Sequence, residues 1–280
     1  MQVVILTLRD PSQHGCGGGD ACACGSGGPV RVPVLACADA LRAADATAEL
    51  VTAGSEAEID EVVARVVAGE VRLVVAAATD PEVRAVVRRF ARALAPRASQ
   101  RPDDLPAIPP LCPALDLPTA AEDVALAVVG GRTRRWDLLR TEGGSVTLHS
   151  VLLGGFDGSN PAPLRARIEV DDTVLTDGSE AVLACAVSNA GSSDVEGLPL
   201  VSDAGADDGL VEVAVAVPTL QRRLLRPAEP RVEVRRARGR AMSVTPRDSS
   251  VRCVDDSVVG PITRKRSWWT EPGAWATYVP

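Results

Sequence analysis

The sequence is poor in aromatic residues and has almost no lysine. Phe, Trp and Tyr make up 2% of the 280 residues, and Lys265 is the only lysine among 30 Lys and Arg residues. A folded core must therefore rely on Val, Leu and Ala, and the hydrophobic content of 46% argues against global disorder. Arginine in place of lysine, together with abundant alanine, indicates a bacterial genome rich in G and C.

Long apolar runs and a basic leader are also missing. No segment approaches the ~20 apolar residues that a membrane-spanning helix needs, and no basic residue precedes the first apolar run. We therefore expect a cytoplasmic protein. The net charge of -7 argues against nucleic acid as a partner and against general attraction to an anionic membrane. Seven cysteines, an odd number, without an export signal indicate reduced thiols.

The first part of the chain alternates between strand and helix patterns. Buried strands are predicted at residues 3–8, 48–52 and 71–76. A helix is predicted at 34–44, a second begins at the capping box of Ser55 and Glu58, and a third begins at Asp80 and Pro81. This alternation predicts an open parallel α/β sheet, whose ligands bind at the carboxyl ends of the strands.

A proline-rich loop at residues 96–118 and a further helix, which ends at Gly130 and Gly131, precede a change to the alternating pattern of β-strands. The predicted strands are 134–140, 145–153, 164–170, 181–188, 210–217, 231–237, 250–254 and 273–279. Many short strands separated by turn residues predict an antiparallel β-sandwich or barrel. We thus predict an α/β domain at 1–130 and an antiparallel β-sandwich domain at 131–280.

Three motifs in the second half occur in the order and spacing of a known family. They are residues 206–213 (ADDGLVEV), 254–257 (VDDS) and 272–280 (PGAWATYVP). The sequence resembles the diacylglycerol kinase and sphingosine kinase superfamily, in which the matching motifs are P-D-D-G-L-L-D-V, V-D-G-E and P-G-A-L-R-V-L-V-P. Asn189 matches the end of a V-G-N-G strand, and His149 stands where the family has the asparagine of N-x-A. The resemblance covers about residues 70–280.

The resemblance implies transfer of the γ-phosphoryl group of ATP to a lipid hydroxyl, with Mg²⁺ and a carboxylate base. It further implies that the domain at 1–130 is nucleotide-binding-like and that the domain at 131–280 takes the lipid acceptor. Asp255 is then the catalytic base, although an aspartate at a strand end is also common turn chemistry. The residues implied to contact the nucleotide are Thr79, Asp80, Gly17, Gly18 and Asn189. Asp80 is equally well explained as a helix cap. Asp207 and Asp208 are candidate ligands of a cation, but Asp-Asp-Gly is also an ordinary hairpin signal.

The nucleotide motifs depart from the family pattern. Residues 78–82 (ATDPE) replace G-G-D-G-T, which adds side chains and, at Pro81, removes an N–H donor where a phosphate would bind. Residues 109–117 lack the glycine and asparagine of the second loop, P-L-G-T-x-N-D. In the V-D-G-E motif, Asp256 replaces the glycine and Ser257 the glutamate. A catalytically inactive relative that binds a ligand or partner is therefore the alternative hypothesis.

Two other segments suggest further functions. His14, Cys16, Cys22 and Cys24 lie in a glycine-rich loop that could bind a metal or respond to redox state, or remain a loop with spare thiols. Residues 264–266 (RKR) precede Trp268 and Trp269, a pattern that suits peripheral contact with the inner face of a membrane or a solvated strand edge. The sequence leaves a homodimer open.

Overall fold

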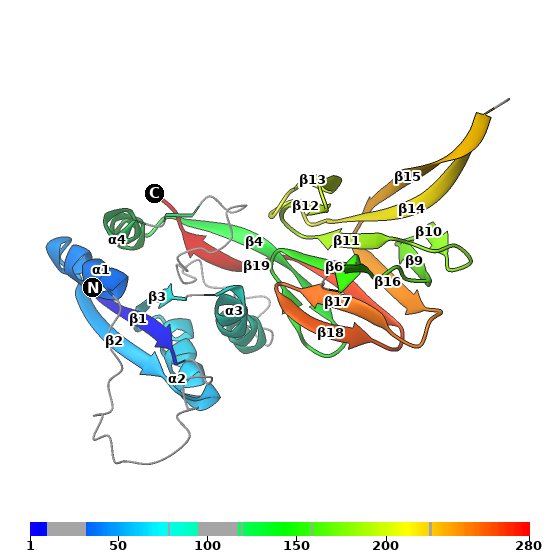
Figure 1. The fold of residues 1–280 in the computed structure, drawn as a ribbon. Coiled ribbons are helices and arrows are strands. Elements are labelled where there is room, and N and C mark those ends of the chain that lie inside the picture. Colours follow the sequence, from blue (N-terminus) through cyan, green and yellow to red (C-terminus); the bar gives the residue numbers. More distant parts are fainter. Residues whose placement is uncertain (10–31, 78, 95–116, 119, 158, 224–225) are drawn as a thin grey trace, which may run out of the picture. The chain divides into compact units, whose positions relative to one another are not determined.

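The computed structural model describes residues 1–9, 32–77, 79–94, 117–118, 120–157, 159–223 and 226–280 (Figure 1). The described residues form two compact units. Unit 1 contains the residues up to 94, residues 117–135 and Trp275–Pro280, and unit 2 contains Trp136–Ala274. Both chain ends therefore belong to unit 1.

Unit 1 is built around a three-stranded parallel sheet with β1 in the middle, in the order β2-β1-β3 (Figure 1). Its strands are β1 (Gln2–Leu8), β2 (Thr47–Ala53) and β3 (Arg72–Ala76), and its helices are α1 (Val32–Ala43), α2 (Glu56–Val67), α3 (Asp80–Leu94) and α4 (Ala121–Gly130). Val3 to Leu6 are completely buried, as expected of a central strand covered on both faces. The predicted α/β alternation is confirmed.

The predicted capping box at the start of α2 is present. The Glu58 N–H donates to Ser55 Oγ at 3.3 Å, and the Gly54 N–H donates to Glu58 Oε2 at 2.6 Å. Ile59, Val62, Val63 and Val66 are buried on one face of the helix. Local chemistry and hydrophobic spacing therefore favour the same helix.

Unit 2 contains two six-stranded sheets, in the orders β10-β9-β16-β19-β4-β5 and β15-β14-β11-β6-β17-β18, together with two small two-stranded sheets. The strands are β4 (Thr133–Thr141), β5 (Val146–Thr147), β6 (Ser150–Gly154), β7 (Phe156–Asp157), β8 (Asn160–Pro161), β9 (Ala166–Val170), β10 (Thr173–Asp177), β11 (Ala184–Ser188), β12 (Gly191–Val195), β13 (Leu198–Ala204), β14 (Val211–Arg223), β15 (Arg226–Gly239), β16 (Ala241–Pro246), β17 (Val251–Asp255), β18 (Val258–Ile262) and β19 (Arg266–Tyr278).

The two large sheets share one hydrophobic core. Ile168 and Val244 contribute to it from one sheet, and Leu153 and Val213 from the other. Trp268 lies in this core with no exposed surface. The predicted antiparallel β architecture is confirmed, and Trp268 cannot serve as an aromatic anchor at a lipid surface because it is fully buried.

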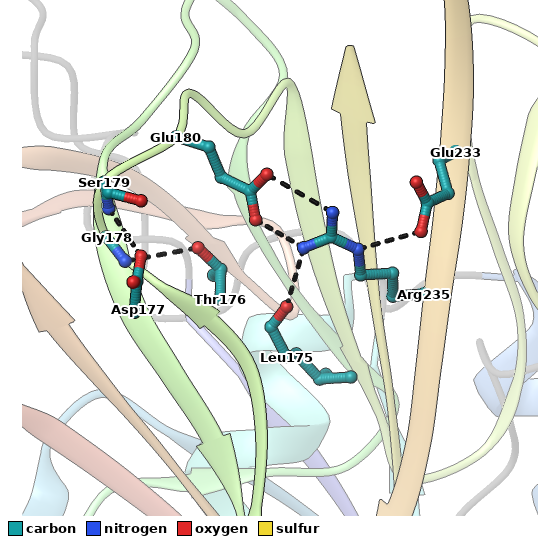
Figure 2. A network of polar contacts seen from close by, with 8 residues as sticks. All are labelled: Leu175, Thr176, Asp177, Gly178, Ser179, Glu180, Glu233 and Arg235. Carbon is teal, nitrogen blue, oxygen red and sulfur yellow. Dashed lines mark hydrogen bonds and ion pairs between the residues drawn. The ribbon is translucent and has the colours of Figure 1, made fainter. Parts of the chain in front are cut away.

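A polar network ties the end of β10 to β15 (Figure 2). The Arg235 guanidinium donates to the Leu175 carbonyl at 3.1 Å and to Glu233 Oε1 at 2.9 Å, and it also binds both carboxylate oxygens of Glu180. The carboxylates of Glu180 and then Glu233 raise the pKa of Arg235. The loop after β10 is thereby fixed to an edge strand of the other large sheet.

No helix in the described ranges is long and apolar enough to span a bilayer.

Candidate functional site

A pocket of about 470 Å³ lies at the carboxyl ends of the parallel strands of unit 1. Its lining comes from the ends of β1 and β2 and from the first turns of α2 and α3: Leu8, Arg9, Ala53, Gly54, Ser55, Glu56, Ile59, Thr79, Pro81, Glu82 and Ala85. This is the edge at which open α/β sheets bind ligands. Helix N-termini at such an edge also carry positive partial charge.

Two backbone N–H groups at the start of α2 that could bind an anion are already hydrogen-bonded to side chains of the chain. Ser55 Oγ and Glu58 Oε2 accept the N–H groups of Glu58 and Gly54 at the start of α2. Pro81 has no N–H to offer. Arg9 is the only basic residue among the described residues that line the pocket. Anion binding here therefore depends on Arg9 more than on the helix ends.

The negative charge of Glu56 is balanced from outside the pocket lining. Arg89 on α3 is 6% exposed and pairs with Glu56 Oε2 at 2.8 Å and with Asp60 Oδ1 at 2.9 Å. The hydrogen bond from Arg89 holds the pKa of Glu56 below its usual value. Glu82 is the second acidic residue that lines the pocket.

The residues that the resemblance assigned to the nucleotide are only partly brought together. Thr79 is exposed, lines the pocket and supplies a carbonyl that accepts the Glu82 N–H at 3.1 Å. Asp80 is the first residue of α3. Gly17 and Gly18, with His14 and the cysteines Cys16, Cys22 and Cys24, lie outside the described residues.

A second polar cluster lies in unit 2, where β6 begins and β11 and β17 end. Asp255, the predicted base, is 7% exposed and accepts a hydrogen bond of 2.6 Å from Thr147 Oγ1. The next residue, Asp256, accepts the N–H groups of Leu148 at 2.6 Å, His149 at 2.9 Å and Ser150 at 3.1 Å. We call residues 148–150, held by Asp256, the clamp.

Asn189 holds the clamp from its other side. Its backbone N–H donates to the His149 carbonyl at 2.8 Å, and its Nδ2 donates to the Leu148 carbonyl at 2.9 Å and to the Asp137 carbonyl at 3.1 Å. The structure thus places Asn189 beside the clamp of unit 2, as a buried support. Its Oδ1 atom is buried without a hydrogen-bond partner among the described residues.

In the Asp207–Asp208 turn, groups of the chain itself occupy the carboxylate of Asp208. Asp208 Oδ1 accepts the Leu210 N–H at 2.8 Å, and Asp208 Oδ2 pairs with the Arg238 guanidinium. Arg238 therefore supplies the positive charge that a metal would bring. Across the described parts of the chain, no three His, Cys, Asp or Glu side chains are grouped as metal ligands.

Asp137 is a structural residue that the sequence did not single out for this role. It is 2% exposed, and its two carboxylate oxygens accept the N–H groups of Gly209 at 2.6 Å and Gly273 at 2.7 Å. It joins two of the three motifs that carry the resemblance. Arg9 and the clamp were also missed, because their roles depend on contacts between distant segments.

Comparisons with known proteins agree with this architecture. No family model and no curated protein matches the sequence. Among solved structures, a diacylglycerol kinase from Bacillus anthracis str. Sterne is similar at 13% identity with a TM-score of 0.65, covering 99% of this chain and 96% of that one. An NAD kinase from Archaeoglobus fulgidus in complex with ATP is similar at 10% identity with a TM-score of 0.51, covering 99% and 93%. These similarities confirm the fold that the sequence resemblance implied.

Proposed function

We propose that this chain, which has the diacylglycerol kinase fold along its length, binds ATP as its magnesium complex and transfers the terminal phosphoryl group to a lipid hydroxyl. The observation that carries the proposal is the 470 Å³ pocket at the carboxyl ends of β1 and β2 and the first turns of α2 and α3. A structure with this fold was solved with ATP. In this proposal magnesium enters with ATP, and Asp208, which is paired with Arg238, is not assigned as its ligand.

The proposed reaction breaks the bond between the terminal phosphorus and the ADP oxygen and forms a bond from that phosphorus to the lipid oxygen. The hydroxyl proton must pass to a base, and ADP leaves. In unit 1, Arg9 is proposed to bind the phosphates and Thr79 to lie beside them, at the start of α3 with Asp80. In unit 2, the resemblance assigns the base to Asp255, which accepts a hydrogen bond from Thr147 Oγ1.

A lipid acceptor also implies contact with a membrane surface. Arg264 and Lys265 are exposed, and Arg266 lies over the ring of Trp268 at 5.9 Å. We propose that this basic segment meets anionic headgroups at the inner face of the membrane. Charge, not aromatic insertion, carries this part of the proposal, since Trp268 is in the core.

A thermal-shift titration with MgATP tests nucleotide binding first, because a ligand that binds only the native state raises its apparent stability. We expect a saturable rise in the melting temperature, and a smaller one in Arg9→Gln. The matched control is Arg42→Gln, since Arg42 is an exposed arginine on α1 that pairs with Asp39 at 2.7 Å and does not line the pocket. Absence of any shift at millimolar MgATP would contradict the proposal.

Turnover is measured as ATP consumption that depends on 1,2-dioctanoylglycerol. The second candidate function is binding without catalysis, and Pro81 and Glu82 at the pocket favour it, because one lacks a donor and the other is acidic. A saturable MgATP shift with no lipid-dependent consumption of ATP would support that candidate. Lipid phosphorylation would exclude it.

A further inference from the structure

The β14–β15 hairpin extends beyond the strand that supports it in its sheet (Figure 1). The two strands pair from Val211 and Gly239 out to Arg223 and Arg226, whereas the neighbouring strand, β11, reaches only to Ala216 on β14. Beyond Ala216 the described part of this sheet therefore continues as a two-stranded ribbon. Two strands alone are marginally stable in water, so a further strand beside the ribbon would stabilise it.

The outer edge of β15 is open to such a strand. β15 is the last strand of its sheet, and in the described parts of the chain no strand pairs with its outer edge. The Arg231 carbonyl accepts a hydrogen bond of 3.4 Å from Thr219 Oγ1 on β14, so the main-chain groups of Arg231 face β14. Main-chain groups alternate in direction along an antiparallel strand, so the N–H and C=O groups of Val232 face the open edge. Outward groups of this kind can pair with another chain.

The side chains beside this edge alternate in charge. Arg231 and Glu233 lie on one face of the sheet and Val232 lies on the other, since side chains alternate along a strand. All three are exposed, Val232 by 44%. Charges of one sign at an edge keep chains apart. Charges of opposite sign attract a partner strand whose charges match them, and they select one register.

We propose that two copies of this chain pair antiparallel through β15, about a two-fold axis at Val232. In this register Val232 lies opposite its own copy, and Arg231 of each chain lies opposite Glu233 of the other, as a two-fold interface requires. A register centred on Arg231 or on Glu233 would instead place like charges opposite each other. The inference is independent of the proposed phosphoryl transfer.

The opposite edge of the same sheet is less suited to this pairing. Its last strand, β18, has five residues, whereas β15 has fourteen. The exposed side chains of β18 include Val258 and Val259, and the strand has no charged residue that would select a register. Short edge strands also offer few main-chain groups to a partner.

Sedimentation velocity of the full chain, at concentrations up to about 100 µM, tests the pairing. We expect a dimer that dissociates on dilution and in high salt, because exposed charges are screened. Arg231→Glu and Glu233→Arg should each be monomeric, since each reversal places like charges opposite each other. An equimolar mixture of the two variants should regain the dimer, because opposite charges then meet at both positions. Recovery in the mixture also excludes misfolding as the cause of the loss.

The matched control for the charge reversals is Arg264→Glu, at an exposed arginine outside β15, which should dimerise like the wild type. A monomeric wild type would overturn the inference. A dimer that survives both single reversals would overturn it as well, because the charges would then have no part in the pairing.

Cross-linking tests the position of the axis. Residues that face each other in a hydrogen-bonded antiparallel pair have Cα atoms about 5.5 Å apart, which a disulfide can bridge. We expect Val232→Cys to form a covalent dimer when copper phenanthroline oxidises the two thiols. The controls are the wild type, which reports on the native cysteines, and Val259→Cys, at an exposed valine of β18. Equal cross-linking in Val232→Cys and Val259→Cys would overturn the assignment to β15.

Discussion

At the scale of single residues, Asp256 explains much of the local structure in the second polar cluster. Its φ of 43° is unusual for a residue other than glycine, and aspartate is among the few side chains that tolerate it. In that conformation its carboxylate accepts three successive N–H groups. The motif that the sequence resembles has glycine at this position, and aspartate adds a support for residues 148–150.

Gly131 is a second residue whose backbone conformation determines what the position tolerates. It ends α4 with a φ of 71°, and a Cβ atom there would lie 2.7 Å from Nη2 of Arg72. That guanidinium donates to the carbonyls of Val128 and Val129 and lies over the Tyr278 ring at 5.3 Å. Arg72 thus neutralises the carboxyl end of the helix.

We predict that Gly131→Ala lowers the free energy of unfolding by about 2 kcal/mol, because it combines a left-handed backbone with displacement of Arg72. The control is Gly130→Ala, since Gly130 is the last residue of α4 and a Cβ atom there meets nothing within 4 Å. Gly130→Ala should leave the free energy of unfolding unchanged or raise it by up to about 1 kcal/mol. Urea unfolding followed by circular dichroism at 222 nm measures both. Equal effects in the two variants would contradict the role of Arg72.

At the scale of elements, the sequence predicted the helices and strands that a local pattern specifies. It missed the features that depend on contacts between distant residues. The run Val3–Leu6 and the capping box of α2 specify their elements by themselves, and both are confirmed. Residues 145–153 were predicted as one strand but form β5 and β6, because Asp256 binds the N–H groups of residues 148–150. That interaction joins residues more than a hundred positions apart, so no local pattern reveals it.

In the candidate site, too, features set by a local pattern were predicted and features set by distant contacts were not. The carboxyl ends of β1 and β2 follow from strand order, and the pocket lies there. The contact of Asn189 with the clamp and that of Asp208 with Arg238 depend on strand pairing across the β-sheets, which the alternating pattern does not determine. The strands β10, β12, β13, β16 and β18 were not predicted either, since their short segments are rich in polar or turn residues.

An ion pair between β2 and α2 provides a test of electrostatics at this scale. Arg65 Nη2 lies 2.7 Å from Glu49 Oε2, with exposed side-chain fractions of 28% and 36%. The hydrogen bond from Arg65 lowers the pKa of Glu49. A carboxylate whose pKa is lowered by folding stabilises the protein above its unfolded pKa, about 4.3, and this contribution is lost as the pH falls through the folded pKa.

We therefore predict that Glu49→Gln lowers the free energy of unfolding by about 0.5 kcal/mol at pH 7 and in low salt, because the pair is partly exposed and screened. The difference from wild type should vanish below about pH 3. Glu196→Gln, a substitution at an exposed residue of the β12–β13 hairpin, removes the same charge and is the matched control. Chemical unfolding at several pH values measures both variants. An effect of Glu49→Gln that persists unchanged at low pH would exclude the ion pair as its cause.

At the scale of the whole molecule, each unit has its own hydrophobic core. The core around Trp268 draws only on residues between 139 and 268, whereas the core of unit 1 joins β1, α1 and α4 to Tyr278 near the carboxyl end of the chain. Among the residues that the structure describes, unit 2 is therefore one continuous segment, Trp136–Ala274, whereas unit 1 needs both ends of the chain. We therefore expect the two units to differ in their ability to fold as separate fragments.

We predict that a fragment of residues 136–274 folds by itself and unfolds cooperatively in urea, followed by the fluorescence of its buried tryptophans Trp136 and Trp268. A fragment of residues 1–135 lacks Tyr278 and the ring that Arg72 contacts, so we expect it to lose cooperative unfolding. Trp268→Ala in the first fragment should lower the free energy of unfolding by about 3–5 kcal/mol. A loss of this size is expected of a packed core but not of a loosely collapsed one. A broad transition that this substitution leaves unchanged would mean that unit 2 folds only within the full chain.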